Sequence, residues 1–252
     1  MNERLFDGKG AVYAQFRPGY PPALFAHLRA EGLLTPETAA VDVGAGTGIF
    51  TRQLAPYVGT VLAVEPNADM RREGRRVRLP NVRFTSGSAE RTGLPDASAD
   101  LISAAQAFHW FDREAFRLEC RRLLRPGGTV LLVWNRRVHD SPLTQALAEV
   151  NRQFCPSFRG FSGGRDLPAD GEAFFRGRFR QAAFPNDVVC GEEAFVGRCL
   201  SSSYAPAADG TPYRRALSAL FHQYSQDGVI RCPYVTQCCY GGVEEPGAPA
   251  GV

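Results

Sequence analysis

Residues 41–50 read Val-Asp-Val-Gly-Ala-Gly-Thr-Gly-Ile-Phe, and this stretch decides the fold because an apolar strand pattern passes directly into a helix pattern. Three glycines, Gly44, Gly46 and Gly48, stand at the turn. Glycine lets the backbone approach a ligand closely, and a helix that begins there directs its unpaired N–H groups at that ligand. The stretch therefore predicts a nucleotide-type cofactor site. Its third glycine comes one position earlier than in the dinucleotide fingerprint.

The composition is that of an ordinary globular protein. With 252 residues and 44% apolar content, the chain can bury one large core, which favours a single α/β domain with insertions. Its 29 basic and 26 acidic residues give a net charge of +3, too balanced to indicate a nucleic-acid or membrane partner. No early apolar segment resembles a signal peptide, and no run approaches the roughly 20 apolar residues of a membrane span. We therefore expect a cytoplasmic protein.

Seven cysteines are present, an odd number without a C-x-x-C pair or a His-rich spacing beside them. Metal binding is therefore not expected. In a reducing compartment, cysteines of this kind are expected to be small apolar core residues or free thiols rather than disulfides. The adjacent pair Cys238 and Cys239 is the one to watch for oxidation.

Strand and helix patterns alternate as far as residue 135. Helix patterns with one apolar face begin near residue 22, near residue 49 and after Asp112. The β-type runs between and after them cover residues 39–43, 60–64, 82–84, 99–104 and 129–134. Neighbouring parallel strands need a helical connection, so the alternation predicts a mostly parallel sheet that is covered on both faces.

The second half of the chain has a looser pattern. Residues 156–178 are rich in Gly, Arg and Phe and are expected to be mainly loop. The Gly, Pro and Ala tail after Tyr240 is expected to be disordered. The remaining elements that we expect are helices at 141–154, 192–200 and 212–226 and strands at 179–189 and 229–239.

An acid stands at the end of the second predicted strand. Glu65 follows the run Thr60–Val64 and lies 21 positions after Gly44 (65 − 44). In a doubly wound sheet, this place is where the hydroxyls of a bound ribose are expected. The carboxylate and the glycine turn together therefore predict a site for a ribose-bearing cofactor.

The order and separation of four segments resemble those of the class I S-adenosylmethionine-dependent methyltransferases, in particular the small-molecule methyltransferases of type 11. The segments are Val41 to Phe50, Glu65, Ser86 to Glu90, and Arg125 to Val133, and the resemblance covers roughly residues 6 to 135. It implies a Rossmann-like, doubly wound, seven-stranded and mostly parallel sheet with an antiparallel last strand and a small cap. It also implies methyl transfer from S-adenosylmethionine to a small-molecule acceptor such as a carboxylic acid or a secondary metabolite.

The resemblance assigns roles to individual residues of the donor site. Glu65 would accept hydrogen bonds from both ribose hydroxyls, and the turn at Gly44 would lie against the methionine part. Ser88 stands where the family usually has an acid that recognises the adenine amino group. The residues implied for cofactor binding are Tyr13, Arg17, Asp42, Gly44, Ala45, Gly46, Thr47, Glu65, Pro66, Met70, Ser88, Ala89, Glu90 and Gln106.

The acceptor side is less defined by the resemblance. His109 follows the fourth strand and would accept a proton from the acceptor or orient it, although a purely structural role is an equal alternative. An acceptor that is already ionised needs no base. Arg136 and Arg137 favour an anionic substrate, whereas Trp110 and Tyr204 would line an apolar pocket.

Domain organisation and partners follow from the same resemblance. We expect one methyltransferase domain over 1–240, with a core of about 33–135 and 179–240 and with cap and substrate elements at about 1–30 and 136–226. Residues 241–252 would form a flexible tail. The expected partner is a small-molecule substrate, and the expected assembly is a monomer or homodimer. Two alternatives stay open: a nicotinamide-dependent oxidoreductase, and a catalytically silent cofactor-binding scaffold.

Overall fold

The computed structural model describes residues 18–76, 78–161, 167–202, 204–206 and 211–243. Its main feature is a seven-stranded sheet with the order β3-β2-β1-β4-β5-β9-β6. The strands from β3 to β5 are parallel to their neighbours, whereas β9 runs antiparallel to both β5 and β6. The predicted mostly parallel sheet with an antiparallel last strand is therefore confirmed. The strands are β1 Ala39–Val43, β2 Thr60–Val64, β3 Val82–Thr85, β4 Ala99–Ala105, β5 Leu124–Arg137, β6 Arg180–Pro185 and β9 Tyr234–Gly241.

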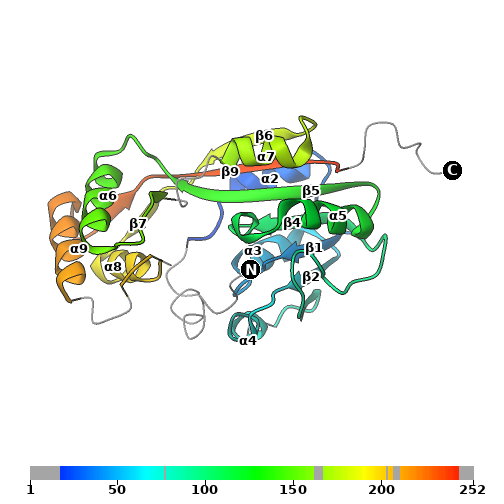
Figure 1. The fold of residues 1–252 in the computed structure, drawn as a ribbon, viewed down its shortest axis with the longest axis horizontal. Helices are drawn as coiled ribbons and strands as arrows, with labels where there is room; N and C mark the ends of the chain where they lie inside the picture. Colours follow the sequence, from blue (N-terminus) through cyan, green and yellow to red (C-terminus); the bar gives the residue numbers. More distant parts are fainter. Residues whose placement is uncertain (1–17, 77, 162–166, 203, 207–210, 244–252) are drawn as a thin grey trace.

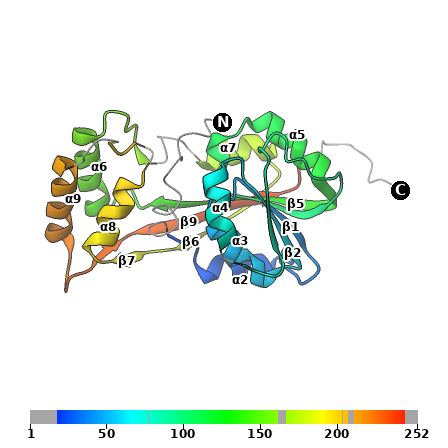
Figure 2. The same ribbon diagram turned by 90° about the horizontal axis from the view of Figure 1, so that it is seen from below.

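Helices cover both faces of this sheet (Figures 1 and 2). Leu24 of α2 and Phe50 of α3 pack on one face, and Phe116 of α5 and Phe174 of α7 pack on the other. Because successive side chains of a strand point to opposite faces, strands covered on both sides need apolar residues throughout, as the sequence shows. The helices of this part are α2 Pro22–Ala30, α3 Ile49–Leu54, α4 Ala68–Arg76, α5 Arg113–Leu123 and α7 Leu167–Phe175.

A second lobe lies at one end of the molecule, where β5 and β9 extend beyond the rest of the sheet (Figure 1). Its core is a separate apolar cluster that includes Leu147, Phe195 and Leu217. The lobe consists of α6 Pro142–Phe154, α8 Glu192–Leu200, α9 Thr211–Tyr224 and the two-stranded sheet of β7 Val188–Cys190 and β8 Ile230–Cys232.

Three predictions about the second half were wrong in detail. The segment predicted as mainly loop contains α7, whose Phe174 and Phe175 are buried against α5 and the sheet. Each of the two predicted late strands is divided into two strands that belong to different sheets. Pro233 separates β8 from β9, and proline cannot donate to a strand ladder. The sequence pattern marks β propensity but not the point at which the chain passes from one sheet to another.

Candidate functional site

Three parallel strands end beside one another at one edge of the sheet, and a predicted site residue follows each of them. Strand β1 lies between β2 and β4, and the residues that follow these three strands are Gly44, Glu65 and Gln106. Ligands of doubly wound sheets bind outside the carboxyl ends of the strands, where the strand order reverses. That reversal falls between β1 and β4, so this edge is the candidate site.

The turn after β1 is held against both neighbouring strands. The backbone N–H groups of Gly44 and Ala45 donate to the carbonyl oxygen of Val64 at 2.9 and 3.1 Å. Gly44 has φ +68°, and a Cβ at this position would lie 2.6 Å from the Cβ of Ala107 in the loop after β4. Glycine is therefore required here by backbone conformation and by the close approach of the neighbouring loop.

The same turn presents two features of a cradle for another molecule. Gly46 has φ +57°, and no described atom lies within 4 Å of a Cβ built on it. The Oγ1 atom of Thr47 is buried and has no hydrogen-bond partner among the described residues. A buried hydroxyl without a partner is unfavourable unless another group satisfies it. Open space beside Gly46 and an unsatisfied hydroxyl at Thr47 both fit a bound ligand at this turn.

Glu65 connects the turn to the end of β2. Its Oε2 accepts a hydrogen bond from the N–H of Gly46 at 2.8 Å, and its Oε1 accepts one from the N–H of Asn67 at 2.9 Å. The side chain is buried, with 8% exposed. Hydrogen bonds to both oxygens fix the carboxylate in one orientation beside Gly46, which is the position predicted for the ribose.

Asp42 lies in β1 itself, and its buried carboxylate contacts α3 and β4. Its Oδ2 accepts from the hydroxyl of Thr51 in α3 at 2.5 Å, and its Oδ1 accepts from Ser103 in β4 at 2.8 Å. Burial raises the pKa of Asp42, the two hydroxyl donors lower it, and the nearby charge of Glu65 raises it. The net result is a pKa of about 6, above the ordinary value of 3.8. Asp42 therefore joins β1 to α3 and β4.

The segment after Glu65 is fixed by a helix cap. Oδ1 of Asn67 accepts from the N–H groups of Asp69 and Met70, each at 3.0 Å, and thereby begins α4. The side chain of Met70 is buried, whereas Pro66 is partly exposed. Pro66 and Met70, predicted to lie on the adenine face, are thus held next to Glu65 by the start of one helix.

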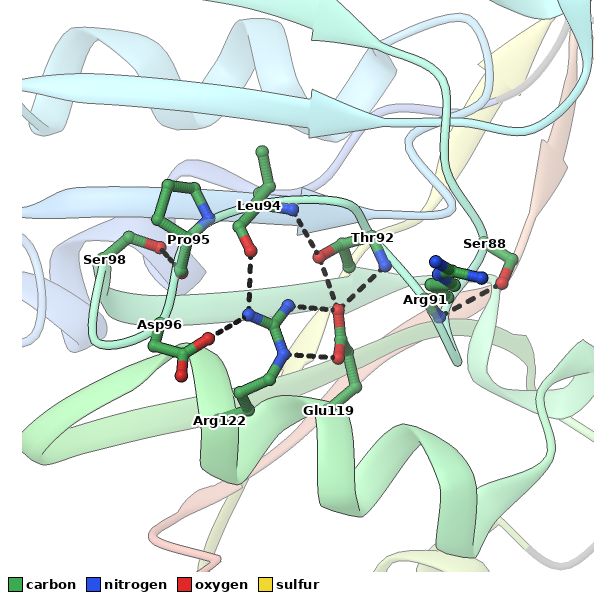
Figure 3. A network of polar contacts seen from close by, with 9 residues as sticks. All are labelled: Ser88, Arg91, Thr92, Leu94, Pro95, Asp96, Ser98, Glu119 and Arg122. Carbon is green, nitrogen blue, oxygen red and sulfur yellow. Dashed lines mark hydrogen bonds and ion pairs between the residues drawn. The ribbon is translucent and has the colours of Figure 1, made fainter.

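A network of polar contacts holds the loop that follows β3 (Figure 3). Oε1 of Glu119 accepts from the N–H and hydroxyl of Thr92 at 2.8 and 2.6 Å, and the Arg122 guanidinium donates to both carboxylate oxygens. Burial raises the pKa of Glu119, but the hydrogen bonds from Arg122 and Thr92 together bring it below its ordinary value. The loop is therefore attached to α5 by a charged pair.

Arg122 extends this attachment along the loop (Figure 3). Its Nη1 donates to the carbonyl oxygen of Leu94 at 2.8 Å and to Oδ1 of Asp96 at 2.5 Å. Five N–H donors in a rigid fork allow one arginine to bind a carboxylate and a backbone carbonyl together. Residues 92–96 are thus held as one unit against the end of α5.

The predicted adenine segment lies directly before this unit. The N–H of Ser88 donates to the carbonyl oxygen of Arg91, and the N–H of Arg91 donates to Oγ of Ser88, so the segment forms a tight turn. Ala89 is buried with 1% exposed. Oε1 of Glu90 accepts from the N–H of Asp112 at 3.1 Å and joins the turn to the residue that caps α5.

The loop after β4 carries His109 at the same edge. Gln106 has φ +56°, an uncommon conformation for a residue with a side chain. Its Nε2 donates to the carbonyl oxygen of Asn135 at 3.0 Å, which holds the loop onto β5. Beyond it, the half-buried rings of His109 and Trp110 lie 4.8 Å apart. The structure thus brings both residues to the edge where Gly44 contacts Ala107.

Asn135 joins this edge to β9, to the β6–β7 turn and to the segment before α2. Its Nδ2 donates to the carbonyl oxygen of Gly19 at 3.0 Å, and its Oδ1 accepts from Nδ2 of Asn186 and the hydroxyl of Thr236. Asn186 Nδ2 also donates to the Gly19 carbonyl oxygen at 3.0 Å. One buried amide therefore connects β5, β9, the β6–β7 turn and the segment before α2.

The predicted acceptor-binding residues divide into separate environments. Arg136 directs its Nη1 to Oε1 of Gln237 on β9 at 2.9 Å. Arg137, the next residue of β5, lies over the rings of Phe161 and Tyr234, with its guanidinium carbon 5.1 and 4.9 Å from their centroids. Successive residues of a strand point to opposite sides, so Arg136 and Arg137 do not form one cationic site.

Tyr204 belongs to the group of aromatic rings that Arg137 contacts. Its ring lies 4.9 Å from that of Phe158, and Phe158 lies 5.3 Å from Phe161. Arg137 and Tyr204 are thus brought together in the second lobe, whereas Trp110 stays in the loop after β4. The predictions for Tyr13 and Arg17 lie outside the described residues.

Two residues of this region, Asn135 and Arg198, were not predicted from the sequence. Asn135 ends an apolar run, and a buried polar residue at a strand end is the signal that would have singled it out. Arg198 lies three positions after Phe195 in α8, on the buried side of the helix, with 8% exposed. An arginine on the apolar face of a predicted amphipathic helix is an equivalent signal.

Within the described ranges, no helix is both long and apolar enough to cross a membrane. The described residues also contain no group of three or more His, Cys, Asp and Glu side chains placed to hold a metal ion.

The strand order and the edge geometry define a class I methyltransferase fold. A family model described as a methyltransferase domain matches residues 41–132. An uncharacterized methyltransferase of Mycobacterium bovis is 37% identical over 240 residues, which cover 92% of this chain and 93% of that protein. An uncharacterized methyltransferase-like protein of Schizosaccharomyces pombe is 34% identical over 186 residues, with 72% and 71% covered.

Solved structures agree with this class. The structure of a putative type II methyltransferase from Anaeromyxobacter dehalogenans has a TM-score of 0.66 and 28% identity, and the match covers 90% of this chain and 98% of that one. The chain therefore belongs to the methyltransferase family, as the sequence resemblance predicted.

Proposed function

We propose that this protein transfers a methyl group from S-adenosylmethionine to a small-molecule acceptor. The observation that carries the proposal is the carboxylate of Glu65, fixed beside Gly46 at the carboxyl edge of β1 and β2. A carboxylate in this place suits the two neighbouring hydroxyls of a ribose. S-adenosylmethionine, when bound, supplies a methyl group that is made electrophilic by a positively charged sulfur.

The residues present fit such a donor. Gly46 borders open space and Thr47 has a buried hydroxyl that lacks a partner in the described chain, so the turn has both room and an unsatisfied polar group. Beside Glu65, we assign Pro66 and Met70 to the adenine face. The further residues that we assign to donor binding are Gly44, Ala45, Ser88, Ala89, Glu90 and Gln106, and we assign Asp42 a supporting role in β1.

The acceptor then lies between the loop after β4 and the second lobe. We propose that His109 orients the acceptor or takes its proton, and that Trp110 forms part of the wall. Placing the acceptor in line with the methyl group supplies much of the catalysis for such a displacement. The elements of the second lobe, α6, α8, α9, β7 and β8, select the acceptor, because they lie where β5 and β9 extend beyond the rest of the sheet (Figure 1).

Neither alternative is favoured by the family to which the chain belongs. A nicotinamide-dependent oxidoreductase would need the other glycine spacing, and position 49, where the dinucleotide fingerprint has its third glycine, is Ile49. A silent scaffold would keep the donor site without turnover.

Transfer of a labelled methyl group from S-adenosylmethionine to a panel of small carboxylic acids, phenols and amines tests the function. We expect label in at least one product with the wild-type protein and much less with Glu65→Gln. If the donor binds but no member of a broad panel is labelled, the scaffold reading replaces catalysis.

A further inference from the structure

We propose that Arg137 and Arg198 form an anion-binding subsite in the second lobe that takes the carboxylate group of an acceptor molecule with an apolar body. The inference rests on the proposed function, because it names the chemical class of the acceptor, but its binding test does not depend on methyl transfer. Arg198 was not predicted as a site residue.

The two guanidinium groups both contact one aromatic ring. The guanidinium carbon of Arg137 lies 4.9 Å from the ring centroid of Tyr234, and that of Arg198 lies 5.3 Å from the same centroid. Arg137 comes from the end of β5, Arg198 from α8 and Tyr234 from the start of β9. Three elements distant in sequence therefore converge at one point of the lobe.

Neither guanidinium is neutralised by an acid of the described chain. Among the described residues, no carboxylate forms an ion pair with Arg137 or Arg198. Asp187 instead accepts from Arg231 and from the N–H of Tyr234. Arg198 is buried with 8% exposed, and its Nη2 has no hydrogen-bond partner in the described part of the chain. Buried positive charge that no described carboxylate balances is strongly unfavourable, which favours an anion at this site.

A thiol beside the arginines does not balance their charge. Cys190 of β7 and Cys232 of β8 lie on neighbouring strands, and a hydrogen bond between their side chains lowers the pKa of Cys190. Burial opposes this shift, whereas the positive charge of Arg198, its side-chain hydrogen bond to Cys190 and the positive charge of Arg137 reinforce it. One thiolate against two guanidiniums still leaves a net charge of +1. A further anion is therefore accommodated even when Cys190 is ionised.

The surroundings favour an anion that carries an apolar body. Phe158, Phe161 and Tyr204 form one ring-contact group, and Arg137 lies 5.1 Å over Phe161. Such a wall suits an aromatic or aliphatic carboxylate better than inorganic phosphate, which has no apolar surface to bury. Arginine also recognises a planar carboxylate with two parallel hydrogen bonds.

The subsite lies within reach of the methyl donor edge. Gln106, which follows β4, donates to the carbonyl oxygen of Asn135, and Arg137 is two residues further along β5. Two residues of a strand span roughly 7 Å, which is the length of a small molecule. A carboxylate held at Arg137 and Arg198 would thus leave the rest of the acceptor directed toward the edge that carries Gln106.

Cys190 provides a local reporter of this charge. The other six cysteines are buried, and Cys190 alone among the seven is partly exposed. Iodoacetate and iodoacetamide are similar in size and differ in charge, so the ratio of their reaction rates at Cys190 measures the local preference for a carboxylate. The rates are followed by peptide mass spectrometry, with glutathione as the free-thiol reference.

We expect the iodoacetate-to-iodoacetamide rate ratio at Cys190 to exceed that of glutathione by about tenfold. Arg198→Gln should return the ratio to the glutathione value, Arg198→Lys should retain part of it, and Arg231→Gln, an exposed arginine of the neighbouring strand, should leave it unchanged. A wild-type ratio at or below that of glutathione overturns the proposal.

Thermal unfolding with benzoate, benzamide and inorganic phosphate is an independent test of the subsite. It gives a result even if Cys190 reacts with neither iodoacetate nor iodoacetamide. Benzoate should raise the melting temperature of the wild type and of Arg231→Gln but not of Arg198→Gln, and benzamide and phosphate should have little effect. Equal stabilisation by benzoate and benzamide, or none by benzoate, contradicts a carboxylate subsite. S-adenosylhomocysteine binding should be the same in Arg198→Gln and the wild type, which separates this proposal from the donor site.

Discussion

The backbone N–H of Gly46 donates a hydrogen bond of 2.8 Å to Oε2 of Glu65 and joins the turn after β1 to the end of β2. The two segments are separated by α3 in sequence, and the parallel pairing of β1 with β2 brings their ends together. The contact depends on the backbone conformation of the turn and on the burial of the carboxylate. Changes at either partner are therefore expected to affect donor binding before they affect the fold.

Substitution of the turn glycines should separate packing from binding. A Cβ at Gly44 would lie 2.6 Å from the Cβ of Ala107, so Gly44→Ala should destabilise the protein by about 2 kcal/mol or more. Gly46→Ala meets no described atom within 4 Å and should lose only about 1 to 2 kcal/mol for its positive φ. Urea unfolding measures both changes.

The affinity for the donor should rank Gly44→Ala and Gly46→Ala differently from their stability. The Gly46→Ala methyl group enters the space assigned to the cofactor, so at a temperature where both variants are folded it should weaken S-adenosylhomocysteine binding relative to the wild type. Equal affinities of Gly46→Ala and the wild type would place the ligand elsewhere.

Asp42 should give the stability a distinctive pH dependence. Its folded-state pKa of about 6 lies above its ordinary value of 3.8, so the folded protein holds a proton there that the unfolded chain has released. The contribution of Asp42 is therefore most favourable below pH 3.8 and is lost as the pH rises to about 6.

Asp42→Asn removes this titration. Relative to the wild type, the variant should gain about 3 kcal/mol in unfolding free energy between pH 3.5 and pH 7. Denaturant unfolding of both proteins across this pH range gives the difference between their unfolding free energies. The contributions of the other acidic residues are the same in both proteins and cancel in this difference. A difference that does not change with pH would show that folding does not raise the pKa of Asp42.

The loop after β3 should depend on Glu119 for its position. Glu119→Gln keeps an acceptor for Thr92 but loses the charged contacts to Arg122, and should cost about 1.5 to 3 kcal/mol of stability. Because the pKa of Glu119 lies below its ordinary value of 4.5, this contribution is present at neutral pH and is lost only as the pH falls below that value.

A matched control shares the same arginine. Asp96, which also pairs with Arg122, has a side chain that is 78% exposed, so Asp96→Asn should change stability by less than about 1 kcal/mol. Hydrogen exchange of residues 86–98 should accelerate in Glu119→Gln and stay near the wild-type rate in Asp96→Asn. Similar exchange in the two variants would contradict the role given to Glu119.

Asn135 should hold β5, β9, the β6–β7 turn and the segment before α2 together. Asn135→Ala removes the contacts to Gly19, Asn186 and Thr236 and leaves buried polar groups unpaired, which should cost about 2 to 4 kcal/mol. Gln223→Ala, at an exposed position of α9, should be nearly neutral. If thermal unfolding does not distinguish Asn135→Ala from this control, the amide does not hold these segments together.

The first half of the fold was predictable from sequence because its signals are local. The apolar runs of β1 and β2 and the glycines between them give the same bounds in the sequence and in the structure. Asp112 was predicted to begin a helix, and its Oδ1 accepts from the N–H of Ala115 as an N-terminal cap. In each case the residues that determine the element lie within it or next to it.

The second half was less predictable because its signals are not local. Whether the segment 167–175 forms a helix depends on the burial of Phe174 and Phe175 against α5, which sequence periodicity does not reveal. The convergence of Arg137 and Arg198 on Tyr234 depends on how α8 packs on the extended strands. Arg136 and Arg137 are adjacent in sequence, yet the strand directs them to different partners.

Calorimetric titration with S-adenosylhomocysteine tests the central claim most directly. We expect one binding site per chain in the wild type and in Glu149→Gln, an exposed control. In Glu65→Gln, the loss of charged hydrogen bonds to the ribose should weaken binding by about tenfold to a hundredfold. Absence of binding at millimolar ligand, or equal affinity of Glu65→Gln and the wild type, would contradict the proposal that this edge of the sheet holds the methyl donor.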